Sequence, residues 1–341
     1  MLRHRITLCV VLAFACLCYA DQLIVPPKWP ELELLVEHPI DNMAEGNLSG
    51  IANCIDGLWV ESDRADLYIY KLISQTNTSV LTAQAVVFKA KTVPKNALSL
   101  FNSLGNVTIG LLRGGIYDFE GISCDADGNK YLVSEAYLAV LKISKEGQTQ
   151  WLTLPNMLWQ QAKAHGLLQK TNQLLEGIVI SPDGKRMWLA AERNKRGILT
   201  LIYNEQSGWQ CPNEQCVLLA EGGLEHFPPA FRRKNRIDAR DFSDLVFYNE
   251  KLFTLERSAF RICRRDLQAN IEQCWSFAKE ALQPQRQYLG YGMPEALWID
   301  DKGAWIGVDS DITNQRVDGE TRPIIWRFAA PEQGWLSTRG N

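Results

Sequence analysis

The sequence is poor in histidine and lacks the short signatures of several hydrolase classes. It has four histidines in 341 residues and no Gly-x-Ser-x-Gly, His-Glu-x-x-His or Walker sequence. These absences argue against an α/β-hydrolase, a zinc metalloprotease and a P-loop nucleotide enzyme. After residue 20 the histidines are His38, His165 and His226. Each fits an ordinary surface or packing position, although His226 lies in a loop that could overhang a pocket.

The chain also lacks an excess of positive charge and a long internal apolar segment. Lys and Arg number 36 against 39 Asp and Glu, which gives a formal net charge of −3. A mildly acidic protein has no general electrostatic attraction to nucleic acid. No internal run approaches the ~20 apolar residues that a membrane-spanning helix needs. We therefore expect neither a nucleic-acid partner nor a membrane span.

The first 20 residues have the layout of a secretory signal peptide. Arg3 and Arg5 precede an apolar run over residues 6–18, and small residues follow before Asp21. This order is typical of a cleaved leader. We expect residues 1–20 to be a signal peptide and residues 21–341 to form a single exported domain, either periplasmic or secreted. A lipid anchor at Cys16 is the weaker alternative.

Cysteine usage agrees with export. Three of the nine cysteines lie in the leader, and the six that remain are an even number, as a disulfide framework requires. No Cys-x-x-Cys pair and no histidine partner occurs, so a zinc site is disfavoured. The expected disulfides are Cys211 with Cys216, Cys263 with Cys274, and Cys54 with Cys124.

One short phrase occurs five times along the chain. Each copy opens with an apolar run that carries Glu-Gly or a related pair, makes a polar turn and closes on an acidic residue. Each copy has the pattern of a β-hairpin, and a repeated hairpin indicates a β-propeller. The copies span residues 48–63, 119–135, 175–192, 242–256 and 294–309.

The repeats predict an all-β fold of six or five blades. Their spacing exceeds the ~40 to 50 residues of a compact four-stranded blade, so a sixth blade is expected within residues 80–117 or 197–240, with five blades as the alternative. We expect residues 32–36 to pair with a C-terminal strand and close the ring. Helical periodicity is confined to residues 156–169 and 277–282.

Acidic residues should converge at one mouth of the propeller channel. The first strand of a hairpin begins where its second strand ends, so both positions lie at the same end of each blade. Eight of these ten positions are carboxylates, which suit a hard cation such as Ca²⁺ or Mg²⁺. The alternative is that they are scaffolding and pair with backbone amides or neighbouring arginines. The ten positions are Ser49, Glu120, Glu176, Ser243, Glu295, Asp63, Glu135, Glu192, Glu256 and Asp309.

These phrases resemble the phytase-like domain family, which is also called esterase-like activity of phytase. The resemblance rests on the Glu-Gly hairpins of the first three repeats and on Ser243-Asp-Leu-Val-Phe247 with Leu255-Glu-Arg-Ser258 in the fourth. It extends over about residues 48–328. It implies an exported propeller that hydrolyses phosphomonoesters or esters with calcium. A second resemblance is to gluconolactonase-like propellers, in which a glutamate at such a strand start binds a divalent cation.

The sequence therefore predicts a monomeric, divalent-cation-dependent hydrolase of a small anionic or ester substrate. A non-catalytic ligand- or protein-binding propeller and a lactone hydrolase remain as alternatives. An arginine-rich loop and two arginines that follow repeats are expected to bind the substrate. The candidate catalytic carboxylates are Glu120, Glu176 and Glu192. The candidate cation ligands are Glu120, Glu176, Glu295, Glu135 and Asp309, with Ca²⁺ preferred, and the candidate substrate-binding residues are Arg193, Arg257, Arg232 and Arg233.

Overall fold

Short antiparallel strands make up most of the chain. The computed structural model describes residues 29–43, 46–90, 116–170, 173–232, 235–310 and 315–337. Five units of antiparallel strands follow one another in the sequence. The first unit comprises β2 (Leu48–Cys54), β3 (Gly57–Ser62), β4 (Tyr68–Ser74) and β5 (Leu81–Val87). The second comprises β6 (Phe119–Cys124), β7 (Lys130–Ser134), β8 (Ala139–Ile143) and β9 (Thr149–Trp151).

The three later units follow the same plan with small additions. The third comprises β10 (Leu175–Ile180), β11 (Arg186–Ala191), β12 (Lys195–Asn204), β13 (Gly208–Gln210) and β14 (Val217–Gly222). The fourth comprises β17 (Asp244–Tyr248), β18 (Lys251–Glu256), β19 (Arg261–Arg265) and β20 (Ile271–Ser276). The fifth comprises β21 (Met293–Asp300), β22 (Gly303–Asp309), β23 (Ile324–Ala329) and β1 (Leu34–Asp41).

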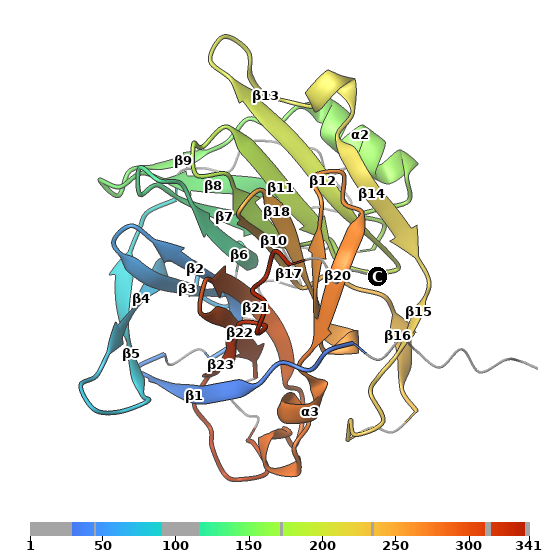
Figure 1. The fold of residues 1–341 in the computed structure, drawn as a ribbon. Helices are drawn as coiled ribbons and strands as arrows, with labels where there is room; N and C mark the ends of the chain where they lie inside the picture. Colours follow the sequence, from blue (N-terminus) through green and yellow to red (C-terminus); the bar gives the residue numbers. More distant parts are fainter. Residues whose placement is uncertain are drawn as a thin grey trace, which may run out of the picture.

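The first strand of each unit faces the centre of the molecule. Strands β2, β6, β10, β17 and β21 each lie beside the next, and β21 lies beside β2 again (Figure 1). Strand β1 pairs antiparallel with β23 and parallel with β5, so it connects the fifth unit to the first. The sequence predicted that residues 32–36 pair with a C-terminal strand, and residues 34–39 do so.

The interval 197–240 does not hold a further four-stranded unit. Strands β12 to β14 belong to the third unit, and β15 (Leu224–His226) pairs only with β16 (Ile237–Ala239) within the described residues. The other proposed interval, 80–117, contributes β5 to the first unit, and its residues 91–115 lie outside the described part of the chain. The preference for six blades therefore gains no support from the described strands.

The helices are shorter than the sequence predicted. The expected helix over 156–169 is α2 (Asn156–Ala164), which ends before Gly166. That glycine has a φ of 78°, a left-handed conformation that terminates helices. The expected helix over 277–282 is α3 (Ala278–Ala281). The described part of the chain also has three short 3₁₀ turns: η1 (Pro212–Glu214), η2 (Arg257–Ala259) and η3 (Pro284–Arg286).

Three disulfides join the cysteine pairs that the sequence predicted. Cys54–Cys124 joins β2 to β6 and so fastens the first unit to the second. Cys263–Cys274 lies across the β19–β20 pair. Cys211–Cys216 closes the short turn around η1.

Glycines at matching positions let the central strands approach one another. A Cβ atom on Gly50 would lie 2.7 Å from the backbone nitrogen of Ile122 in β6. A Cβ atom on Gly121 would lie 3.1 Å from the carbonyl oxygen of Glu176, and one on Gly177 would lie 3.0 Å from the Cα atom of Asp244. The Glu-Gly signature of the repeats thus reflects backbone packing between neighbouring units.

Gly50→Ala should destabilise the fold by about 1–3 kcal/mol, because its methyl group would overlap backbone that cannot move without shifting a strand. Urea denaturation gives the free energy of unfolding. Gly222→Ala is the matched control, since a Cβ atom there would meet its nearest neighbours at 3.5 Å or more. Equal stability of the two variants would contradict the packing argument.

Candidate functional site

Four central strands each have a β-bulge near their start, and the bulged residue of each strand belongs to the site. The register between the first two strands shifts at 48/50, 119/121, 175/177 and 294/296. A bulge leaves one residue without a ladder partner and can re-aim its side chain. The unpaired residues are Ser49, Glu120, Glu176 and Glu295.

These residues line a polar cavity of about 370 Å³ at the end of the central strands. Eight of the ten convergent positions that the sequence predicted line it, so distant repeats do meet at one place. We call this cavity the acidic mouth. Its lining is Asn47, Ser49, Asp63, Arg64, Glu120, Glu135, Glu176, Glu192, Arg193, Arg257, Tyr291, Glu295 and Asp309.

The fourth repeat departs from the prediction, since Ser243 and Glu256 do not line the mouth. No register shift occurs between β17 and β18. Glu256 is buried against arginines: an Arg196 nitrogen lies 3.0 Å and an Arg265 nitrogen 3.1 Å from its carboxylate. Burial alone would raise the pKa of Glu256, but Arg196, Arg261 and Arg265 lower it to about 2. This carboxylate is therefore scaffolding.

Arg257, the residue after Glu256, lines the mouth where Glu256 was expected. It is buried, and its Nε donates to Asp241 at 2.9 Å. Its two terminal nitrogens donate to Glu295 and Glu192, and one of them lies 3.7 Å from Glu176. The sequence predicted that Arg257 binds substrate. In the structure Arg257 contacts four carboxylates, as the scaffolding alternative anticipated for such arginines, and its contact with substrate stays a prediction.

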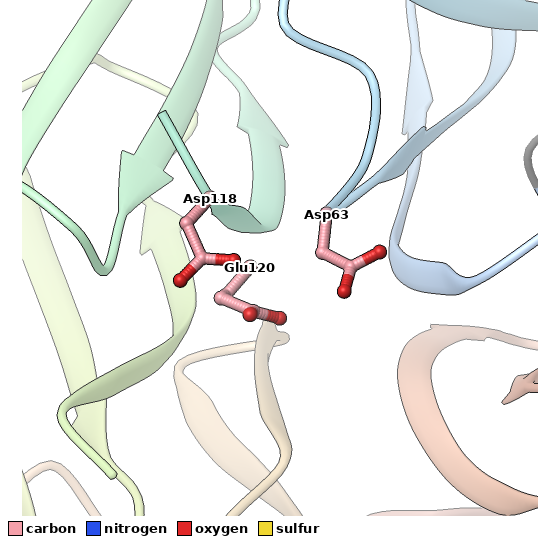
Figure 2. A group of neighbouring side chains, drawn as sticks. All are labelled: Asp63, Asp118 and Glu120. Atoms are coloured by element: carbon pink, nitrogen blue, oxygen red, sulfur yellow. The ribbon is translucent and has the colours of Figure 1, made fainter. Parts of the chain in front are cut away.

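Among the described residues, two groups of carboxylates are close enough to hold a cation. In Asp63, Asp118 and Glu120, one oxygen from each lies within 4.8 Å of the others, and the same holds for Glu135, Glu176 and Glu192. Figure 2 shows Asp118 and Glu120 side by side on the second unit, with Asp63 opposite them on the first. We call these groups the outer triad (Asp63, Asp118, Glu120) and the inner triad (Glu135, Glu176, Glu192).

The two triads differ in how their charge is balanced. In the inner triad, Glu192 pairs with both Arg193 and Arg257. In the outer triad, burial raises the pKa of Glu120 well above its ordinary value. The charges of Glu176, Asp118, Asp63 and Glu135 raise it further. Like charges held together in this way favour either protonation or a bound cation.

Glu61 adds a further buried carboxyl beside the outer triad. It is 1% exposed, and neither of its oxygens has a hydrogen-bond partner within the described part of the chain. Burial raises its pKa well above the ordinary value, and the charges of Asp63, Asp244, Asp118 and Asp309 add to the effect. Sequence analysis did not identify Glu61 or Asp118. Asp118 directly precedes the second repeat, and its φ of 49° is unusual outside glycine and asparagine.

The remaining predicted residues are dispersed. Arg193 lies at the edge of the mouth, whereas Arg232 lines a different cavity. Arg233 lies outside the described residues. None of the described histidines lines the mouth. His38 instead stacks on Trp305, and His226 lies in β15.

Comparison with known proteins assigns the chain to a family. The model of the phytase-like family, described as esterase-like activity of phytase, matches residues 44–259, which is more than half of the chain. The chain therefore belongs to the phytase-like family. A search of curated proteins finds no match. No helix among the described residues has the length and apolar character to cross a membrane.

The solved structures that match the chain are distant in sequence. A chain of the nidogen–laminin complex is 12% identical, with a TM-score of 0.43, covering 82% of this chain and 84% of that one. Glutaminyl cyclase from Myxococcus xanthus is 8% identical, with a TM-score of 0.42, covering 87% and 97%. Virginiamycin B lyase from Staphylococcus aureus is 14% identical, with a TM-score of 0.35, covering 88% and 75%.

Arg257→Gln should cost about 3–5 kcal/mol of stability at neutral pH, because it leaves Glu192, Glu295 and Asp241 buried without their shared cation. Chemical denaturation gives the value. Arg193→Gln is the control, since its side chain is 26% exposed and its loss should cost less than about 1 kcal/mol. Similar losses in the two variants would show that Arg257 does not balance the mouth.

The ion pairs of Glu256 should also appear in the pH dependence of stability. A carboxylate whose pKa is lower in the folded state stabilises the fold above its unfolded pKa of ~4.3, and this contribution is lost as the pH falls toward 2. Glu256→Gln should therefore show a smaller loss in urea midpoint between pH 4.5 and 2 than the wild type. Parallel pH profiles would contradict the role assigned to Glu256.

Proposed function

We propose that the protein is a divalent-cation-dependent hydrolase of phosphate or carboxylic esters that acts at the acidic mouth. The observation that carries this proposal is the outer triad, three carboxylates from two units with oxygens within 4.8 Å of one another. Beside it lies Glu61, a buried carboxyl whose oxygens have no hydrogen-bond partner within the described part of the chain. Membership of the phytase-like family supports hydrolysis of this kind.

The donor atoms of the outer triad fit a hard divalent cation. Three carboxylate oxygens within 4.8 Å of one another can all touch an ion whose oxygen ligands lie at 2.3–2.6 Å, as in calcium sites. Asp63, Asp118 and Glu120 would be the ligands, with Ca²⁺ preferred and Mg²⁺ as the alternative. The inner triad fits less well because Arg257 and Arg193 already balance Glu192.

Protein groups at the mouth can hold and move a proton. A cation there would polarise the scissile group and lower the pKa of a water molecule. Burial and the charge of Glu192 raise the pKa of Glu176, while Arg257 lowers it, and a positioned carboxylate of this kind can act as a general base. The charge of Glu176 acts on Glu120, and Glu176 is not one of the three carboxylates of the outer triad. We assign it as the general base.

We further propose that residues 21–341 form one exported five-bladed propeller after removal of residues 1–20. Five consecutive units with neighbouring first strands support the blade number. Three disulfides support an oxidising compartment, the periplasm or the cell exterior.

A non-catalytic binding propeller is the second candidate. The extensive contacts of Arg257 favour it, because they show that part of the acidic mouth is a balanced scaffold. Turnover measurements decide between the two candidates, and a lactone substrate in the same assay tests the gluconolactonase-like alternative.

The protein should hydrolyse a phosphomonoester or an aryl ester in calcium, and a chelator should abolish this activity. Glu176→Gln should lower kcat by about 10²–10⁴, the usual contribution of a general base. Glu120→Gln should raise the calcium concentration needed for half-maximal activity. Initial rates over a calcium titration measure both effects.

Glu205→Gln, at an exposed turn, is the control and should keep wild-type rates. Calcium should also raise the thermal midpoint of the wild type but not of Asp118→Asn, since a ligand that binds only the folded state stabilises it. Absence of turnover with a calcium-induced rise in midpoint would favour the binding propeller. Absence of both would reject the cation site.

A further inference from the structure

A second cavity adjoins the acidic mouth and has the opposite chemistry. It measures about 330 Å³ and lies between the segment around Phe231, the end of η2, and residues 281–293. Tyr291 lines both cavities, and its hydroxyl donates to Glu295 at 2.7 Å. A ligand that fills this second cavity would therefore lie directly beside the acidic mouth.

The walls of this cavity are aromatic and its charged groups are all positive. Phe260, Met293 and Trp326 are buried beneath it. Among the described residues, no Asp or Glu lines it, in contrast to the mouth. We call it the arginine–aromatic pocket, defined by Phe231, Arg232, Arg236, Phe260, Tyr288 and Trp326.

Arg232 is the cation with the least neutralised charge in this pocket. Arg236 pairs with Asp238 at 2.9 Å and stacks on Phe227. Arg286 pairs with Glu37 and Glu280. Arg232 donates to the carbonyl oxygen of Tyr288 at 2.9 Å, and within the described part of the chain it forms no ion pair with a carboxylate.

The rim of the pocket exposes apolar groups to solvent. Leu289 is 55% exposed and Tyr291 41%, and both lie on the segment that forms one wall. The loop is held in place, since the Tyr288 ring packs on Gly292, where a Cβ atom would lie only 2.1 Å from it. Residues 287–289 also bond to the backbone of Gln315 and Val317. A fixed concave wall with exposed apolar groups is typical of a ligand site.

We propose that the arginine–aromatic pocket binds a small organic anion with an aromatic or branched apolar body. The apolar body would lie against Phe231 and Phe260, and the anionic group would meet Arg232 at the rim. The identification of this anion with the non-reacting part of the hydrolase substrate rests on the proposed function. Binding of such an anion does not depend on turnover.

Fluorescence titration with 8-anilinonaphthalene-1-sulfonate, an aromatic anion, tests the pocket in the folded protein. One saturable site is expected. Arg232→Gln should weaken it about tenfold, because a charge-assisted contact is lost. The uncharged probe N-phenyl-1-naphthylamine should be unaffected by Arg232→Gln. Phe231→Ala should weaken both probes. Arg240→Gln is the matched control, since Arg240 lies on the same segment outside the pocket.

Loss of sulfonate binding in Arg232→Gln and Phe231→Ala, with an unchanged thermal midpoint, would support the pocket even if no ester is hydrolysed. Unchanged sulfonate affinity in both variants would overturn it even if esters are hydrolysed. Equal weakening by Arg240→Gln and Arg232→Gln would also overturn it, because the effect would then come from general surface charge.

Discussion

The centre of this protein depends on the balance between buried carboxylates and one arginine. Arg257 contacts carboxylates from the third and fifth units and from the segment before the fourth. A buried charge is tolerated only when another charge or several hydrogen bonds compensate it. One half of the mouth has this compensation within the protein. In the other half, burial and the charges of neighbouring carboxylates raise the pKa of Glu120 well above its ordinary value.

This asymmetry gives the repeats different tasks. The bulged residue is serine in the first unit and glutamate in the second, third and fifth, while the fourth has no bulge and contributes Arg257 instead. A symmetric ring of carboxylates would repel itself around the axis. One arginine in place of one carboxylate removes that repulsion on one side of the mouth.

The sequence predicted much of this arrangement and missed the parts that depend on contacts between units. The hairpins, the Cys54–Cys124 disulfide and the convergence of Glu120, Glu176 and Glu295 follow from a repeat that can be read along the sequence. The roles of Arg257 and Glu256 do not, because the sequence of the fourth repeat does not reveal that its first two strands pair without a register shift. Glu61 and Asp118 escaped notice because they lie outside the repeated positions, and their importance comes from burial. The arginine–aromatic pocket joins the 231–236 segment to residues 281–293, which no local pattern connects.

The pairing of β1 with β23 affects the order in which the chain folds. It is the first described strand to be synthesised, yet its antiparallel partner β23 is the last. Contacts between such distant segments form late, because the long intervening chain must be ordered first. During synthesis, β1 would remain without β23 until almost the whole of the described chain has been made. Its unpaired edge would then be open to other chains, so assembly of the final sheet is the step at which a folding helper would matter most.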